Sequence, residues 1–237
     1  MTADVDTLAD DERRVISDIW YRRAEGERAA SETFRVVTDG LAALDAEPEL
    51  IALSKRAVDD ELRHADRCWQ LSCIYAGRVR PEAAPRDGAL PRYIGASEEL
   101  RHSLLVVGQC CLNETTASAF LERCLQTTTA PAARATFRVL LSDEIDHARI
   151  GWAHLASPRL SAEARAAIAA WLPSMIASNL RAWHARPDVP TAPVYAAHGV
   201  LPLASTNQAV DAAVADLILP GLRHVGIDVP TSLQALA

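Results

Sequence analysis

Two short stretches of this chain combine carboxylates with a histidine at a spacing suited to metal binding. They are Asp60-Glu61-Leu62-Arg63-His64 and Asp143-Glu144-Ile145-Asp146-His147, and each contains Glu-x-x-His. Residues three apart on a helix project from one face, so each glutamate and its histidine can bind the same ion. The two stretches therefore predict two helices that each contribute one carboxylate and one imidazole to a metal centre.

Two further glutamates extend this pattern. Glu32 stands 29 residues before Glu61, and Glu114 stands 30 residues before Glu144. If each pair faces across a helical hairpin, the chain must reverse near residues 46–47 and near residue 129. Both midpoints fall beside a proline that can open a helix. The repeated order of ligands is that of dinuclear carboxylate helix bundles. The predicted metal ligands are Glu32, Glu61, His64, Glu114, Glu144 and His147.

Two alternatives to these ligands are present in the sequence. Glu25 and Glu27 precede Glu32 on the same expected helix, and Glu32 is preferred on the hairpin midpoint and on its small or apolar neighbours. A third Glu-x-x-His, Glu99 to His102, has no acidic partner about thirty residues away. It reads better as acids in the first turn of a helix. We therefore leave this third pair out of the predicted site.

The composition favours an all-α protein. Apolar residues make up 49% of the 237, aromatic residues only 5%, and there are 10 glycines. The formal charge of −7 argues against nucleic acid as a partner. We expect no membrane span, because no apolar run approaches about 18 residues, and no signal peptide, which predicts a cytoplasmic location. The five cysteines lack a Cys-x-x-Cys pair and are interpreted as buried apolar residues.

The expected architecture is a four-helix bundle with one long connection. Helices are predicted over residues 10–40, 48–76, 97–126 and 132–156, with residues 78–96 crossing back so that the second and third helices run parallel. The predicted organisation is a frayed terminus (1–9), a metal-binding bundle (10–156) and a helical extension (157–237). The extension could cap the bundle, shape a substrate pocket or form a homodimer.

The run Asp60-Glu61-Leu62-Arg63-His64 resembles the Asp-Glu-x-Arg-His motif of di-iron monooxygenase hydroxylases and related ferritin-like oxidases. The second copy departs from that motif, because Asp146 stands in the place of the arginine. The resemblance implies a ferritin-like fold. It also implies that the aspartate of each motif orients the histidine of the other, so Asp60 would hold His147 and Asp143 would hold His64.

Ferritin-like kinship implies oxygen or peroxide chemistry at two iron ions, although manganese or a mixed Mn/Fe pair uses similar ligands. We expect an oxidase or oxygenase that acts on a small organic molecule with an external electron donor, because about eighty residues follow the fourth helix. The alternatives are a ferroxidase, a rubrerythrin-like peroxidase, and a non-catalytic helical assembly module.

Overall fold

The computed structural model describes residues 5–86, 90–229 and 233, and within these ranges the protein contains helices and loops but no strand. Residues 1–4 of the expected frayed terminus lie outside the described residues. Val5–Thr7 forms a short 3-10 helix, η1, and Leu8 is buried against the core. Burial of this leucine fixes the start of the first long helix.

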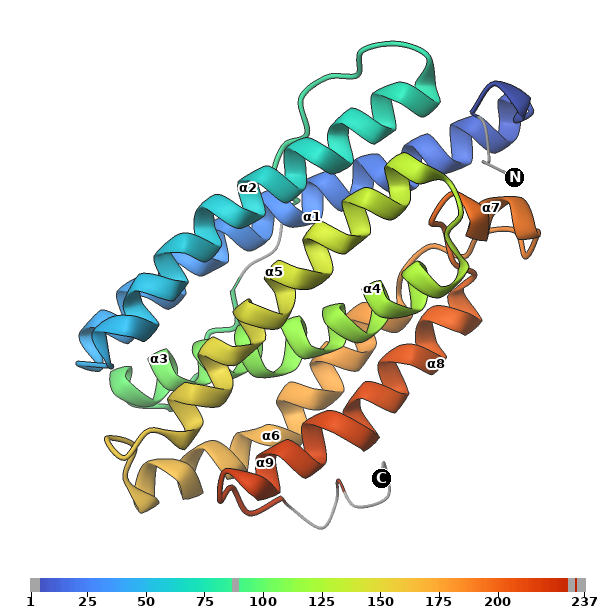
Figure 1. Ribbon diagram of the computed structural model, residues 1–237. Coiled ribbons are helices and arrows are strands. Elements are labelled where there is room, and N and C mark those ends of the chain that lie inside the picture. The colour runs from blue at the N-terminus through green and yellow to red at the C-terminus, as the bar shows by residue number, and fades with distance from the viewer. Residues whose placement is uncertain (1–4, 87–89, 230–232, 234–237) are drawn as a thin grey trace.

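The first two long helices, α1 (Asp10–Ala43) and α2 (Pro48–Ala76), form an antiparallel hairpin (Figure 1). Pro48 occupies the first turn of α2, as predicted, where its missing N–H costs no hydrogen bond. Gly77 ends α2 in a left-handed conformation, φ 64°, and its N–H bonds back to the last turn. These local signals set the length of the hairpin.

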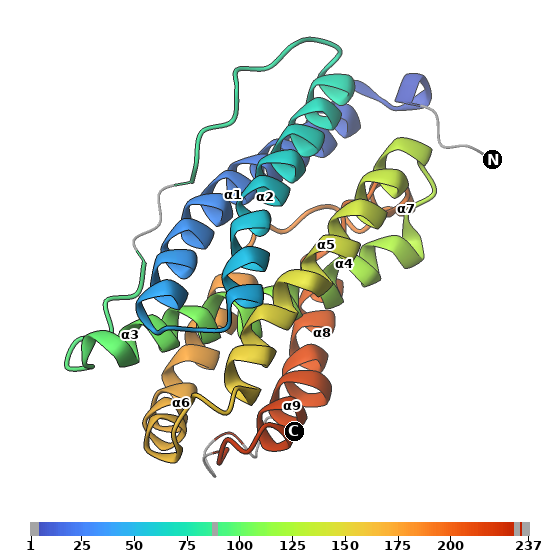
Figure 2. The ribbon, with the colours of Figure 1, turned by 60° about the vertical axis from the view of Figure 1, so that its left-hand side comes forward.

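The chain then returns along the hairpin to the far end of α1, and Figure 2 shows the described parts of this crossover, residues 77–86 and 90–97, running outside the helices. The next helical run is continuous from Glu98 to Thr127. It comprises α3 (Glu98–Val106), a π-helical segment η2 (Val107–Glu114) and α4 (Thr115–Thr127). Ser97 caps its start through Oγ, which accepts a hydrogen bond from the N–H of Leu100. The crossover was predicted, whereas the π-helical segment was not.

A short turn leads to α5 (Pro131–Ala156), which completes a second antiparallel hairpin. Helix α5 packs against η2 and α4 on one side and against α2 on the other, and α3 packs against α1. The two hairpins therefore face each other. Gly151 allows α5 to lie close to η2, because a Cβ atom at this position would lie 2.6 Å from the backbone nitrogen of Cys111.

The remaining helices pack against the helical run from α3 to α4, on the side that faces away from the α1–α2 hairpin (Figures 1 and 2). They are α6 (Ala162–His184), α7 (Pro193–Ala197), α8 (Leu203–Ala213), η3 (Val214–Ile218) and α9 (Leu219–His224). Pro220 and Gly221 are residues that usually end a helix, but the helical run continues through them to His224. The π-helical turn of η3 precedes Pro220, which places this proline in a first turn where no N–H is needed.

The helical run from Glu98 to Thr127 has the length and hydropathy of a membrane span, which the sequence reading did not anticipate. Of its most apolar stretch, 61% is buried inside the protein. This run is thus the core helix against which α5, α6 and α8 pack.

The apolar core of the two hairpins is divided into two clusters. One surrounds Trp20 and Phe137, and the other surrounds Phe34 and Ile150. Between them lies a layer of buried glutamates and histidines, with the Phe34 ring 5.0 Å from the ring of His147. Apolar packing on both sides keeps water from these charged side chains, and this polar layer is the candidate functional site.

Candidate metal centre

Two histidines and two glutamates form the centre of this polar layer. Nδ1 of His64 lies 3.5 Å from Oε2 of Glu61 and 3.3 Å from Oε1 of Glu144. Nδ1 of His147 lies 3.3 Å from Oε1 of Glu61 and 2.9 Å from Oε2 of Glu144. Each glutamate therefore offers one oxygen to each histidine, and all four side chains are buried. This exchange relates the α2 motif to the α5 motif in a nearly two-fold arrangement.

The outward-facing nitrogens of the two imidazoles are held by aspartates of the opposite motif. Nε2 of His64 lies 3.0 Å from Oδ2 of Asp143, and Nε2 of His147 lies 3.3 Å from Oδ2 of Asp60. The crossed pairing implied by the family resemblance is present in the structure. An N–H donated from Nε2 to a carboxylate leaves the Nδ1 lone pair free and directed at the two glutamates.

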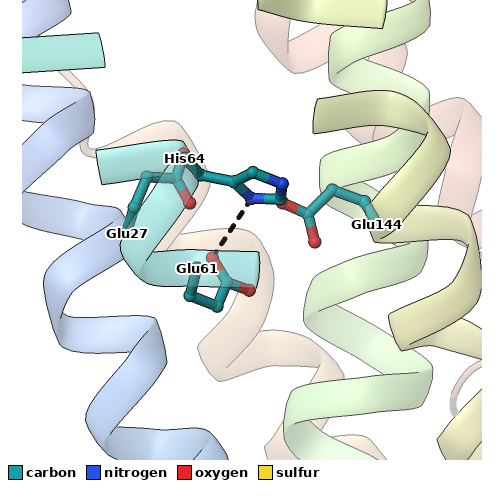
Figure 3. Close-up of side chains that lie close together, drawn as sticks. All are labelled: Glu27, Glu61, His64 and Glu144. Atoms are coloured by element: carbon teal, nitrogen blue, oxygen red, sulfur yellow. Dashed lines mark ion pairs between the residues drawn. The ribbon is translucent and has the colours of Figure 1, made fainter. Parts of the chain in front are cut away.

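Helix α1 contributes Glu27 to the cluster and not Glu32. Ligand atoms of Glu27, Glu61, His64 and Glu144 all lie within 4.8 Å of one another, and Figure 3 shows these side chains converging from three helices. Glu32 is exposed on the surface of α1. The preference for Glu32 was therefore wrong about which face of the helix it occupies.

The apolar pattern of α1 contained the signal for Glu27. Buried positions recur at steps of three or four, and position 27 fills the one gap of seven among them: 16, 20, 24, 31, 34, 38 and 41. Five residues rotate a helix by about 140°, so Glu32 must point away from this seam. The hairpin midpoint sets only the height of a residue along the helix, and the small or apolar neighbours of Glu32 did not identify the buried face.

Glu114 lies in the cluster, at the end of the π-helical segment η2. It is 2% exposed, and its pKa is raised well above its usual range by burial and then by the charges of Glu144 and Glu61. The Gln109 amide donates a hydrogen bond to Oε1 of Glu114 from the other end of the same wide turn. π-Helical turns are rare and often occur at functional sites. No motif in the sequence indicated a role for Gln109.

Burial and neighbouring charges shift the pKa values of the other ionisable groups in the layer. Burial raises the pKa of Glu27 well above its usual range, and the charges of Glu61 and Glu144 raise it further. Burial opposes ionisation of Glu144 as well, but hydrogen bonds from His147 and His64 outweigh it and lower the pKa to about 2. In the same way, the nearby carboxylates of Glu144 and Glu61 outweigh burial and raise the pKa of His64 to about 11. Protons therefore balance the buried carboxylates in the absence of a cation.

The geometry fits metal ions better than protons. Both carboxylate oxygens of Glu61 and Nδ1 of His64 are buried and make no hydrogen bond, although other ligand atoms lie within 3.5 Å. Buried polar atoms without partners are rare in native proteins. Ligand atoms at about 2.1 Å from a six-coordinate ion stand about 3 Å apart, which is close to the separations seen here. Divalent cations placed among these atoms would satisfy them.

A cavity of about 300 Å³ opens beside the polar layer. It lies between α1 and α4, and four of the clustered glutamates form part of its wall: Glu27, Glu61, Glu114 and Glu144. The rest of the wall is largely apolar, with Phe120 and Leu140 among its residues. The C-terminal extension covers the cavity with Trp183 and with residues 186–206. The carboxylate cluster is therefore accessible to a small molecule from inside the protein.

The aromatic and histidine side chains of the extension do not all line this cavity. Trp183 lines it, whereas Trp171 lines a separate recess between α3, η2 and α6. His198 is buried elsewhere, where Nδ1 lies 2.8 Å from the Tyr75 hydroxyl. His154, two turns beyond His147 on α5, lies 3.3 Å from Ser103 and takes no part in the cluster. His154 is therefore a core histidine.

Comparisons of the chain with protein-family models, with curated proteins and with solved structures found no match.

Proposed function

We propose that this protein is a ferritin-like, non-haem di-iron oxidoreductase that uses dioxygen to oxidise a small organic molecule. The observation that carries the proposal is the exchange of carboxylate oxygens between two histidines, in which Glu61 and Glu144 each face both His64 and His147. One ion per histidine, with the two glutamates shared, uses every one of these atoms. Glu27 and Glu114 would complete the ligand set, one from each hairpin.

The donor set suits iron or manganese. Four carboxylates balance the charge of two divalent ions, so the loaded centre is neutral in a dry core. Two such ions supply redox chemistry towards dioxygen or peroxide. The protein residues hold the ions, orient the imidazoles through Asp60 and Asp143, and exclude bulk water.

The enclosed cavity favours an organic substrate over iron storage. A site that only oxidises iron needs a path for cations, whereas this cavity has a largely apolar wall that reaches the carboxylates. An external electron donor is part of the proposal, because reduction of dioxygen to water takes more electrons than oxidation of the substrate supplies. A ferroxidase or peroxidase remains the second candidate, since the same ligands support it.

The ligand assignment is tested by metal content. Protein produced in iron-rich medium should hold about two ions per chain. Elemental analysis of His64→Ala should show a sharp loss, and His102→Ala, which alters the third Glu-x-x-His pair, is the matched control and should retain its metal. On α1, Glu27→Gln should lose metal while Glu32→Gln should not. Full metal retention in both His64→Ala and Glu27→Gln would disprove the assignment.

The reaction class is tested by adding dioxygen, and separately hydrogen peroxide, to the anaerobic ferrous protein. A substrate oxidase should oxidise only the bound pair and consume dioxygen repeatedly when a reductant and substrate are present. Mineralisation of hundreds of iron ions would instead identify a storage protein. Absence of any oxidation would identify a structural helical module. Size-exclusion chromatography of the same samples tests the predicted homodimer.

A further inference from the structure

The outer end of the cavity is lined by arginines. Arg22, Arg86 and Arg186 line both the cavity and an adjoining open recess, whereas the clustered glutamates line the cavity alone. The three arginines therefore stand at the mouth and the glutamates at the inner end. Arg23 also lines the cavity. In a chain with a formal charge of −7, this concentration of positive charge at one opening is a local feature.

Two of these arginines lack a carboxylate partner among the residues that the structure describes. The Arg23 guanidinium donates a hydrogen bond to the Gly199 carbonyl through Nη2, while its Nη1 is buried without a partner. Arg186 makes no ion pair with a described residue, and its guanidinium stacks 3.5 Å from the centre of the Trp183 ring. Burial, and then the charge of Arg23, lowers the pKa of Arg186 to about 9, and the charge of Glu27 only partly opposes this shift.

Aromatic rings hold both guanidinium groups in place. Arg23 lies 4.4 Å from the Trp20 ring centre and 5.6 Å from that of Phe120, and Arg186 lies 5.1 Å from the same Phe120 ring. Stacking on rings fixes the plane of a guanidinium and leaves its N–H edges available. Two such groups around one phenyl ring form a preorganised donor set for an oxyanion.

We propose that the cavity binds an organic acid whose oxyanion is held by Arg23 and Arg186 and whose apolar body extends along the cavity wall towards Glu61 and Glu144. The apolar wall between the two ends includes Ala117 and Leu140. An acid bound in this way places carbon atoms remote from the acid group next to the metal centre. Binding of the acid does not require the proposed function, whereas a role for the acid as the substrate rests on it.

The test uses matched probes of one chain length, octanoate and 1-octanol, titrated calorimetrically into the full-length protein. We expect octanoate to bind about tenfold or more tightly than 1-octanol, because charge-assisted hydrogen bonds add to the same apolar contacts. Arg186→Gln should weaken octanoate binding about tenfold to a hundredfold and leave 1-octanol unchanged. Arg186→Lys should restore part of the loss. Arg181→Gln, an exposed arginine on α6, is the control and should bind octanoate like the parent protein.

Equal affinity for the two probes, or octanoate binding unaffected by Arg186→Gln, would overturn the inference. Preferential binding of octyl phosphate over octanoate would assign the oxyanion to a phosphate ester. Repeating the titration with metal-free and iron-loaded protein separates the two proposals. Arginine-dependent binding without any dioxygen consumption would leave the inference standing and refute the oxidase function. Dioxygen consumption without octanoate selectivity would do the reverse.

Discussion

The motif helices α2 and α5 place the same candidate ligands in the polar layer, but their surroundings differ. Asp60 of α2 is 2% exposed, whereas the matching Asp143 of α5 is 23% exposed at its side chain. The Arg63 guanidinium of α2 donates a hydrogen bond to Asp60 and lies 3.7 Å from Asp143, so one arginine serves both aspartates. The second motif needs no arginine of its own.

The comparison also explains why Asp146 replaces the arginine in the second motif. Arg56 of α2 lies 2.8 Å from Asp146 and 3.5 Å from Asp60. An arginine at position 146 would face Arg56, and two cations at that distance repel each other. Arg149 of α5 also pairs with Asp146, so this aspartate has a cationic partner on each helix. The charge at position 146 thus complements its surroundings, although it departs from the first motif.

The largest expected effect tests the equivalence of the two shared glutamates. Glu61→Gln and Glu144→Gln should each lose both metal ions, because each glutamate faces both histidines. Elemental analysis of both variants, prepared side by side and confirmed as helical by circular dichroism, measures the loss. Retention of one full ion in either variant would show that the two motifs bind separate ions. It would contradict the sharing of Glu61 and Glu144 between the two histidines.

A smaller effect should distinguish the two aspartates. Asp60→Asn should weaken metal binding about 10–100-fold, because a buried carboxylate that orients a ligating histidine is lost. Asp143→Asn should cost less, since its carboxylate is partly exposed and water can replace it as an acceptor for His64. Competition with a chromophoric chelator gives both affinities. A larger loss in Asp143→Asn would contradict the link between burial and effect.

The two helices also differ at the position ten residues after each shared glutamate, which is Leu71 on α2 and His154 on α5. Burial lowers the pKa of His154 to about 4, the nearby Glu47 acts against this shift, and Arg165 adds to it. The unfolded chain therefore binds a proton below pH about 6.5 that the folded chain excludes. The stability associated with neutral His154 is complete above that pH and is lost as the pH falls towards 4.

His154→Leu, which makes α5 match α2, removes this dependence. We expect the variant to gain about 1–2 kcal/mol relative to the parent protein between pH 7 and pH 5. Urea unfolding of both proteins in chelator at the two pH values measures the difference, and chelation removes any contribution from bound metal. Parallel pH profiles would show that His154 accepts a proton without cost in the folded state.

The smallest effect should come from restoring the motif arginine. Asp146→Arg should lower stability by about 1 kcal/mol or less, because Arg56 is 53% exposed and solvent screens the repulsion. Adding Arg56→Asp should recover most of that loss by reversing the pair. The coupling energy from this double-mutant cycle, measured by urea unfolding at low salt, should vanish at high salt. A coupling near zero at low salt would remove the charge explanation for Asp146.

Much of this arrangement was predictable from local sequence signals. Pro48 and Pro131 marked two helix starts, the spacing of Glu114 from Glu144 marked one hairpin, and the Glu-x-x-His pairs marked both motif helices. These signals act within a few residues or along one hairpin. The identity of the α1 glutamate was missed because height was weighed above helix face, although the buried seam of α1 indicated Glu27.

Other features could not be read from the sequence because they depend on contacts between distant segments. The π-helical turn that joins Gln109 to Glu114 has no local composition signal. The placement of Arg186 beside Arg23 depends on how the extension folds back over α1. Helix propensities and breakers, including Pro220, likewise predicted an earlier end to the last helix because they do not register a preceding wide turn.

The crossover over residues 77–97 has a consequence for assembly of the centre. It joins two segments that each hold part of the proposed ligand set, with Glu27, Glu61 and His64 before it and Glu114, Glu144 and His147 after it. Metal bound by all six would act as a clamp between half-proteins, and the loop would set their effective concentration. Chain scission there would turn an intramolecular centre into a bimolecular one, whose reassembly would depend on protein concentration and on metal.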